Sequence, residues 1–396
     1  MHSLLQSQDA STRPNAQNIA NLVRALAVLK HQLKDARFLD DFCIYMHSLL
    51  QSQDARARPT AQNIANTLWA LAVLKQPPKD ARLLDDFCMY MYSLLHSRDV
   101  RARPNAQEVA NTQWGLAKMK HAPSSGVASA TLDYFVALCQ APGLQPTPQE
   151  TSNCFLACAE LNLDICRAQV EVLLKHLLQP HVTKVEYQEY SNTAWSLAVM
   201  GCLEASMFDA LLYQFTMKHK LLLEEHGTEA TSAQPTVEAA KQLHQAIEYL
   251  RPSQGSGQME AWSRLHSRLQ AVAPAPHPVP QYFRGHTKFH DALATHRLLY
   301  KPMVPCGMYQ ADAVLSPHGS NGPQVILMLQ RSKHFVRNVR SRLLGSVRFR
   351  MKMLGRYGAV VTVPYKQGRS SVESMAGAIE AAVEAKTGLP LDFFRH

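Results

Sequence analysis

The sequence lacks several features that would have assigned it to a specialised class. None of its 396 residues belongs to an apolar run of 18, so we expect no membrane span. Its eight cysteines include no Cys-x-x-Cys pair, and Cys154 and Cys158 lie four apart on a helical pattern without a flanking histidine. We therefore expect reduced core thiols in a reducing compartment, not a zinc site or a disulfide framework. The first twelve residues contain no Lys or Arg, so neither a secretory leader nor an Arg-rich transit peptide is visible.

Acidic residues are scarce in the last third of the chain. Residues 1–280 carry 24 basic and 25 acidic side chains, whereas residues 281–396 carry 17 basic and 6 acidic ones. The densest run, from Arg331 to Arg356, has nine Lys or Arg and no carboxylate. Such a run indicates a polyanionic partner, either nucleic acid or an anionic surface, and the alternative is a solvated basic face.

An internal repeat dominates the N-terminal part. The segment MHSLLQSQD at Met1 returns at Met46 and, as MYSLLHSRD, at Met91, a period of 45 residues. Residues 1–45 and 46–90 are identical at 34 of 45 positions. Two weaker copies follow, and the five units share a frame that ends at Asn21, Asn66, Asn111, Asn153 and Asn192. A duplicated unit of this kind stacks on itself.

Each unit has the pattern of two helices. Pro14, Pro59, Pro104 and Pro146 are expected in the first helical turn, where a missing N–H costs nothing. Apolar residues recur at helical spacing in the first helix (Ile19, Leu22, Leu26, Leu29) and in the second (Phe38, Phe42, Met46, Leu49). Neither stripe can be buried by one helix alone, so we expect an α-solenoid of about five helical pairs over residues 1–222.

The remainder is expected to form a small α/β domain behind a linker. Residues 223–280 contain helical patterns near 236–250 and 258–272 and the Pro-rich segment APAPHPVP. Residues 281–368 predict helices at 286–299 and 343–357 and strands at 309–315, 325–329 and 359–363, with a hairpin loop near 319–322. Residues 369–396 predict a final helix, 371–386, and a tail.

Two columns of polar residues differ between the units yet face the same way. The first consists of Asn15, Thr60, Asn105, Thr147 and Glu186; the second, three residues on, of Asn18, Asn63, Glu108, Glu150 and Glu189. Their amide, hydroxyl and carboxylate groups are those that hydrogen-bond base edges. These positions are therefore candidates for base recognition. The alternative is a solvent-exposed polar face on which the residue types vary between units without functional consequence.

Other polar positions are the same in every unit. Gln17, Gln62, Gln107, Gln149 and Gln188 lie four residues before the five frame asparagines. Because an identical side chain cannot read different bases, we favour a structural ladder of amide hydrogen bonds there over base recognition. Trp69, Trp114 and Trp195 follow the frame asparagine by three residues, and helix packing is favoured over base stacking for them.

The C-terminal basic run supplies a second set of candidates. Arg348, Lys352 and Arg356 fall on one side of the expected helix, opposite Val347, Met351 and Leu354. The loop before this helix contains Arg331, Lys333, His334, Arg337, Arg340 and Arg342. This clustering is typical of sites that bind a phosphate backbone without base specificity.

These motifs resemble a known pair of families. The frame PTAQNIANTLWALA from Pro59 is similar to the octotricopeptide repeat of green-algal organelle proteins, an RNA-binding α-solenoid. The segments GMYQADAVL and VILMLQRSKHFVRNVRSRLLGSVRFRMKMLGRYGAVVTVPY resemble the RAP domain that follows such repeats. The resemblance covers most of the chain and implies a RAP-like α/β domain related to restriction-endonuclease-like folds.

Nuclease chemistry in such folds needs several carboxylates around a divalent metal. Asp312 matches the first of them, but Met328 and Gln330 stand where the family usually has an acidic pair. We therefore expect no catalytic residue, no metal and no cofactor.

We expect a non-enzymatic RNA-binding protein that acts on single-stranded organelle mRNA or rRNA, in processing, stability, splicing or translation. Other RNA-binding proteins are candidates for further partners. We expect neither a membrane partner nor a small-molecule substrate. The alternatives are a weak metal-dependent endoribonuclease and a protein scaffold. The resemblance implies chloroplast or mitochondrion. Met1 aligns with Met46 and Met91 inside a repeat, so we also expect the protein to continue upstream of Met1.

Overall fold

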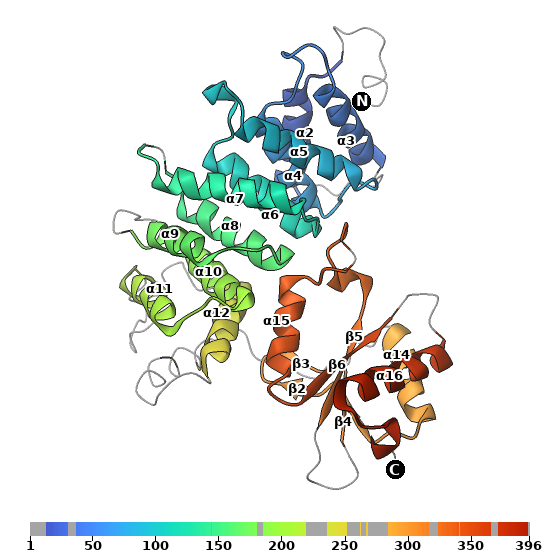
Figure 1. Cartoon of the computed structure of the whole chain (residues 1–396). Helices are drawn as coiled ribbons and strands as arrows, with labels where there is room; N and C mark the ends of the chain where they lie inside the picture. Colours follow the sequence, from blue (N-terminus) through green and yellow to red (C-terminus); the bar gives the residue numbers. More distant parts are fainter. Residues whose placement is uncertain are drawn as a thin grey trace. The chain divides into compact units, whose positions relative to one another are not determined.

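The chain divides into two compact units (Figure 1). The computed structural model describes residues 13–30, 37–143, 145–179, 185–218, 236–251, 262, 267, 284–316, 324–339, 341–365 and 371–394. Unit 1 comprises residues 1–202, 206–219 and 336–342, and unit 2 comprises residues 203–205, 220–335 and 343–396. The two units are described separately.

Unit 1 consists of helices that alternate between two rows. The first row contains α2 (Ala16–Val28), α4 (Ala61–Leu74), α6 (Ala106–Met119), α8 (Pro148–Leu161) and α10 (Tyr187–Met200). The second contains α3 (Arg37–Leu50), α5 (Arg82–Leu95), α7 (Ser125–Gln140) and α9 (Arg167–Leu177); α11 (Ala205–Lys218) follows α10, and a short 3-10 helix, Val100–Ala102, precedes α6. Each helix packs on the next helix of its own row, from α2 to α10 and from α3 to α9. The repeated helix pairs expected from the sequence are therefore present.

The first-row helices from α4 to α10 are more deeply buried than those of the second row. In α4 and α10 most side chains are inaccessible to solvent, whereas α3 and α5 bury one stripe that includes Phe42 and Phe87. The predicted stripe of the first helix is partly wrong, because Leu29 is the C-cap residue and is 76% exposed. Gly115 brings α6 close to α4, since a Cβ added there would lie 2.9 Å from the backbone of Leu68.

The ends of the first-row helices repeat closely. The four prolines expected in the first turn lie one residue before the N-caps Asn15, Thr60, Asn105 and Thr147, so the predicted helix start was early. At the other end the chain turns through a residue with positive φ in every unit: Lys30, Lys75, Lys120, Asn162 and Gly201. In α4 the N–H of Lys75 bonds the Ala72 carbonyl and the N–H of Gln76 bonds the Leu71 carbonyl, which is a Schellman motif.

Unit 2 contains a mixed sheet in the order β1-β4-β5-β6. Its strands are β1 (Tyr300–Pro302), β4 (Ala313–Leu315), β5 (Val325–Gln330) and β6 (Ala359–Pro364), and β2 (Pro305–Cys306) with β3 (Tyr309–Gln310) forms a separate hairpin. Strand β5 pairs antiparallel with β4 and parallel with β6. The expected strand over 309–315 is thus two strands, interrupted at Ala311 and Asp312. The expected hairpin loop, 319–322, lies outside the described residues.

Helices cover both faces of this sheet (Figure 1). Helices α14 (Arg284–Thr295) and α16 (Val372–Thr387) pack on one face, where Phe289, Leu327 and Ile379 belong to one core. On the other face α15 (Gly345–Leu354) links β5 to β6, and Tyr249 of α12 (Val237–Leu250) packs against Phe349 of α15 at a ring distance of 5.8 Å. The core reaches Phe394 in a short 3-10 helix, Leu391–Phe394, so the domain extends to the C-terminal residues expected as a tail. Most of the helix expected at 258–272 lies outside the described residues.

Within the part of the chain that the structure describes, no helix is both long and apolar enough to cross a bilayer.

Candidate nucleic-acid interface

A polar groove runs along the first row of helices in unit 1. It has a volume of about 210 Å³ and is lined by side chains from α2, α4, α6 and α8. Its residues are Arg24, Gln62, Ala65, Asn66, Trp69, Gln107, Glu108, Asn111, Gln149, Glu150 and Asn153. Three consecutive units therefore contribute the same pair of amides to one continuous surface.

These amides were expected to form a structural ladder. The expected bond occurs in α10, where Gln188 Nε2 donates to Asn192 Oδ1 at 2.9 Å, and Asn192 is buried there. In the three central units the glutamine is exposed and the asparagine half-buried on the groove wall. The same Gln and Asn residues thus have different environments: in α10 they bond each other, and in the three central units they line the groove. Sequence reasoning therefore missed them as candidate binding residues.

The two columns predicted to read bases form the N-terminal caps of the same helices. In α4 the Asn63 N–H bonds Thr60 Oγ1 at 3.3 Å and the Thr60 N–H bonds Asn63 Oδ1 at 3.0 Å. This reciprocal arrangement is the capping box, in which two unpaired N–H groups at the helix start are satisfied. It explains why a polar residue occurs at both positions in every unit.

The other units repeat this cap. Asn105 and Glu108 exchange two bonds of 2.9 Å, and Thr147 and Glu150 exchange bonds of 2.7 and 3.3 Å. The same positions are bonded in the first and last units: the Asn18 N–H bonds Asn15 Oδ1 at 2.8 Å, and the Glu186 N–H bonds Glu189 Oε2 at 2.5 Å. The spacing of three between the columns therefore has a structural cause.

Two cap residues also belong to the groove. Glu108 and Glu150 line it, and their caps use one carboxylate oxygen each. Burial raises the pKa of Glu108 above its usual range, partly offset by the bond from the Asn105 backbone. Glu189 has a raised pKa for the same reason. Of the ten predicted base-reading residues, Glu108 and Glu150 line this groove.

The tryptophan column is not uniform. Trp195 is buried in α10, in agreement with a packing role. Trp69 is half-buried and lines the groove, and Trp114 is half-buried with the Lys118 ammonium 5.6 Å from its ring centre. Arg24 replaces the tryptophan in the first unit and lines the groove at the α2 end.

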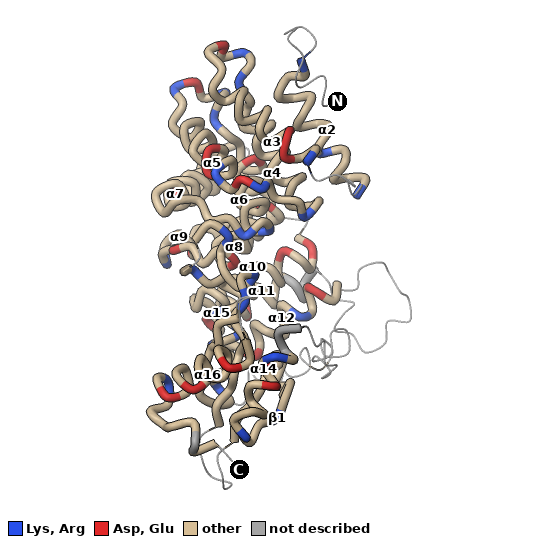
Figure 2. Tube along the Cα trace, turned by 90° about the vertical axis from the view of Figure 1, so that its right-hand side faces the viewer, with Lys and Arg blue, Asp and Glu red and all other residues tan. Residues whose placement is uncertain are grey.

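Charges in unit 1 are mixed along the helices (Figure 2). Segment 336–342 of the basic loop clusters with this unit. There the Arg337 guanidinium donates to the Pro78 carbonyl at 2.7 Å, and the Asn338 side chain accepts from the Ala122 N–H at 3.0 Å. Arg342 is half-buried, and Arg340 lies outside the described residues.

The predicted cationic strip on α15 belongs to unit 2, and its three members differ in environment. Arg348 is exposed. The Lys352 ammonium lies 4.7 Å from the ring centre of Tyr249, and the Arg356 guanidinium donates to the backbone carbonyls of Glu248 and Tyr249. Lys352 and Arg356 therefore hold the C-terminal end of α12 against α15.

The buried side of α15 also differs from the prediction. Phe349, Met353 and Leu354 are buried, whereas Val347 and Met351 are half-buried. Arg356 lines a hollow of about 310 Å³ together with Glu248, Arg251 and Tyr357.

The remaining predicted cations precede α15. Lys333 is exposed and Arg331 is half-buried, and burial lowers the pKa of Arg331. His334 accepts a bond from the Arg331 N–H at its Nδ1 (3.3 Å). Burial, followed by the positive charges of Arg331, Arg350 and Lys333, lowers the pKa of His334 to about 4. His334 is thus neutral at pH 7 and adds no positive charge to the run.

Asp312, the carboxylate that resembles a metal ligand, lies buried beside β5. Its Oδ2 accepts the Leu329 N–H at 2.8 Å, and its own N–H bonds the Leu327 carbonyl. Met328 is fully buried in the strand and Gln330 is half-buried. Among the described residues, no group of three or more His, Cys, Asp or Glu side chains is arranged to hold a metal ion.

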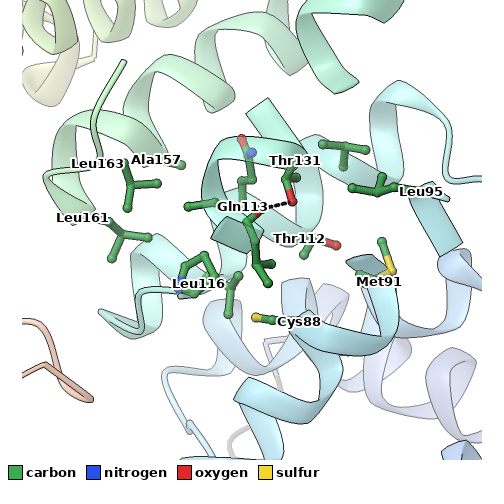
Figure 3. Close-up of a pocket in the computed structure, with 14 residues that line it drawn as sticks. Cys88, Met91, Leu95, Thr112, Gln113, Leu116, Thr131, Ala157, Leu161 and Leu163 are labelled. Carbon is green, nitrogen blue, oxygen red and sulfur yellow. Dashed lines mark hydrogen bonds between the residues drawn. The ribbon is translucent and has the colours of Figure 1, made fainter. Parts of the chain in front are cut away.

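A second hollow lies between the two rows around α6 (Figure 3). It is lined mainly by apolar side chains of α5 to α8, among them Met91, Leu116 and Leu161, and its volume of about 30 Å³ has room for roughly two waters. Two buried oxygens at this hollow, Thr112 Oγ1 and Gln113 Oε1, have no hydrogen-bond partner among the described residues. The position of Gln113 is apolar in the other units, where Val23, Leu68, Phe155 and Ala194 occupy it.

No family model matches the chain, and no curated protein is detectably similar to it.

Proposed function

We propose that unit 1 is an α-solenoid that binds single-stranded RNA along its first row of helices, and that unit 2 is a RAP-like domain whose exposed cations contact phosphates. The protein acts without catalysis in the post-transcriptional control of organelle transcripts. The assignment to organelle transcripts rests on the resemblance to octotricopeptide-repeat and RAP proteins alone.

The observation that carries the proposal is the groove formed by repeated amide pairs. Asparagine and glutamine donate and accept at the same time, as the edges of unstacked bases do. Three identical pairs in a row, at Gln62 with Asn66, Gln107 with Asn111 and Gln149 with Asn153, form a surface suited to a polymer with repeated hydrogen-bonding groups. Trp69 on the same wall adds a ring on which a base can stack.

The proposal is tested by RNA binding at several salt concentrations. A variant with Gln62, Gln107 and Gln149 all changed to Ala should bind RNA more weakly, while the slope of log affinity against log salt stays the same, because amides neutralise no phosphate. Gln140→Ala, an exposed glutamine of α7 outside the groove, is the matched control and should bind like the unchanged protein. Failure of the unchanged protein to bind any RNA in a salt-dependent manner would replace the proposal with a protein scaffold.

Cleavage assays with Mg²⁺ or Mn²⁺ test the non-enzymatic part. We expect the RNA to remain intact. Metal-dependent cleavage that is lost in Asp312→Asn would replace the proposal with an endoribonuclease. Crosslinking followed by sequencing of the bound RNA then identifies the transcript.

A further inference from the structure

The groove of unit 1 presents the same recognition groups at regular intervals. In α4, α6 and α8 the wall includes one exposed glutamine and one half-buried asparagine from each helix. Identical side chains cannot distinguish different bases at successive positions, so they are suited to the same base at each position. We propose that this groove binds a run of adenines in single-stranded RNA. This inference rests on the proposed RNA-binding function and names the sequence class.

The carboxylates of the groove favour bases that carry an amino group. Glu108 and Glu150 line the groove in two successive units, and the capping bond of each is made by Oε2, one of two carboxylate oxygens. A carboxylate accepts hydrogen bonds and donates none. The exocyclic N–H₂ of adenine, cytosine or guanine therefore fits beside it, whereas uracil has no amino group and its carbonyl oxygens are repelled.

The amides and the ring favour adenine over guanine and cytosine. A carboxamide bonds adenine at two points, accepting from N6 and donating to N7, whereas guanine presents two acceptors, O6 and N7, on the same edge and matches only the donor of the amide. The second N6 hydrogen then remains for a carboxylate such as Glu108. Trp69 offers a half-buried ring on the same wall, and preferences among bases on such rings follow stacking strength, which favours the larger purine.

The charges of the groove orient the strand. Arg24 is the one cation among the described residues that line it, and it lies on α2, whereas Glu108 and Glu150 lie farther along the row on α6 and α8. Phosphates are repelled by these carboxylates, so the bases face the groove and the sugar-phosphate backbone faces solvent. The groove then contributes base selectivity, while the salt dependence of binding comes from the cations that contact phosphates.

The experiment compares end-labelled RNA decamers by fluorescence anisotropy at one salt concentration. The probes are A10, U10, C10 and an abasic decamer of equal charge. A10 should bind at least about tenfold more tightly than each of the other three, because one bidentate contact alone discriminates by that factor. Equal affinity for A10 and the abasic decamer, or a preference for U10 or C10, overturns the inference while leaving RNA binding itself intact. If none of the four probes binds, the proposed function fails as well.

Two variants connect the preference to the groove. Asn111→Ser replaces one wall amide with a hydroxyl and should reduce the preference for A10, with little effect on the abasic decamer. Glu108→Gln retains an oxygen that can accept the Asn105 N–H, so the helix cap persists, but the carboxylate is gone and the preference for A10 over U10 should fall severalfold. Thermal melting that matches the unchanged protein shows that each variant is folded. A folded Glu108→Gln protein with an undiminished A10 preference contradicts the inference.

Discussion

The phenol of Tyr90 in α5 donates a 2.8 Å hydrogen bond to the backbone carbonyl of Pro59, just before α4. The bond returns in the next unit, from Tyr134 to Pro104 at 2.9 Å. In the fourth unit a histidine replaces the tyrosine, and His176 Nε2 lies 2.7 Å from the Pro146 carbonyl oxygen. Each bond ties the second helix of a unit to the loop that enters its first helix. Burial raises the pKa of Tyr90, so its phenol remains a donor across the physiological range.

This contact predicts a measurable stability loss. Tyr90→Phe removes the donor and leaves the Pro59 carbonyl without that bond, which should lower the free energy of unfolding by about 1 kcal/mol. Urea denaturation measures it. Tyr213→Phe, at a tyrosine of α11 that is 61% exposed, is the control and should change stability by less than about 0.5 kcal/mol. Equal effects of the two changes would show that the contact contributes nothing.

The repeats were predictable because apolar residues that recur at helical spacing in the sequence are also among the residues buried between the helices. Ile64 and Phe87 are buried in α4 and α5, and an apolar residue stands 45 positions before and after each of them, so periodicity alone indicates two helices per unit. The exact helix starts were not predictable from proline, since Pro59 precedes the N-cap and offers its carbonyl to Tyr90. A bond to a residue 31 positions away has no local sequence signal.

The helix ends predict a stabilising change. Lys75 adopts φ 57°, a left-handed conformation that costs a residue with a side chain roughly 1 kcal/mol relative to glycine. Lys75→Gly should therefore raise the free energy of unfolding by up to about 1 kcal/mol, because the last unit already has Gly201 at this position. The reverse change, Gly201→Lys, should lower it by a similar amount. Chemical denaturation of both variants decides, and a destabilised Lys75→Gly protein would contradict the argument.

The hollow around α6 predicts a second stabilising change. Gln113 places a buried amide oxygen without a partner among the described residues at a position where the preceding unit has Leu68. Gln113→Leu should raise the free energy of unfolding by about 1–3 kcal/mol, the cost of an unsatisfied buried polar group. Gln140→Leu, at an exposed site of α7, is the matched control and should stay within about 0.5 kcal/mol. A loss of stability in Gln113→Leu would mean that the amide oxygen has a partner, such as a bound water.

The candidate site was harder to predict than the fold. Variation between units pointed to Thr60 and Asn63 as base readers, yet these residues cap α4, because a spacing of three serves a capping box as well as a shared helix face. Identity between units favoured a structural role over base recognition for Gln107 and Asn111, and both residues line the groove. Which side of a helix row remains open depends on how neighbouring helices pack, and single-helix periodicity does not contain that information.

His334 predicts a pH dependence of stability. Its pKa in the folded protein is about 4, below the ordinary value of 6.5, so the unfolded chain binds the proton more tightly. This contribution to stability is fully present above pH 6.5 and is lost as the pH falls from about 6.5 to 4. Protonation also removes the Nδ1 acceptor of the Arg331 N–H. In His334→Gln, denaturation at pH 7, 6 and 5 should show a smaller loss than in the unchanged protein. Parallel curves for the two proteins would refute the assignment.

Arg348 and Arg356 should respond differently to the same substitution, although both belong to the basic run of the sequence. Arg348 is exposed on α15, so Arg348→Gln should lower RNA affinity for all sequences alike and reduce the salt slope by about one phosphate contact. Arg356 donates to the terminal carbonyls of α12, and Arg356→Gln should cost about 1 kcal/mol in the free energy of unfolding because these carbonyls lose their donor. Salt titration of RNA binding and urea denaturation, performed on both variants, separate the two roles. An unchanged salt slope in Arg348→Gln would remove Arg348 from the RNA-binding surface, and an unchanged midpoint in Arg356→Gln would free Arg356 for phosphate contact.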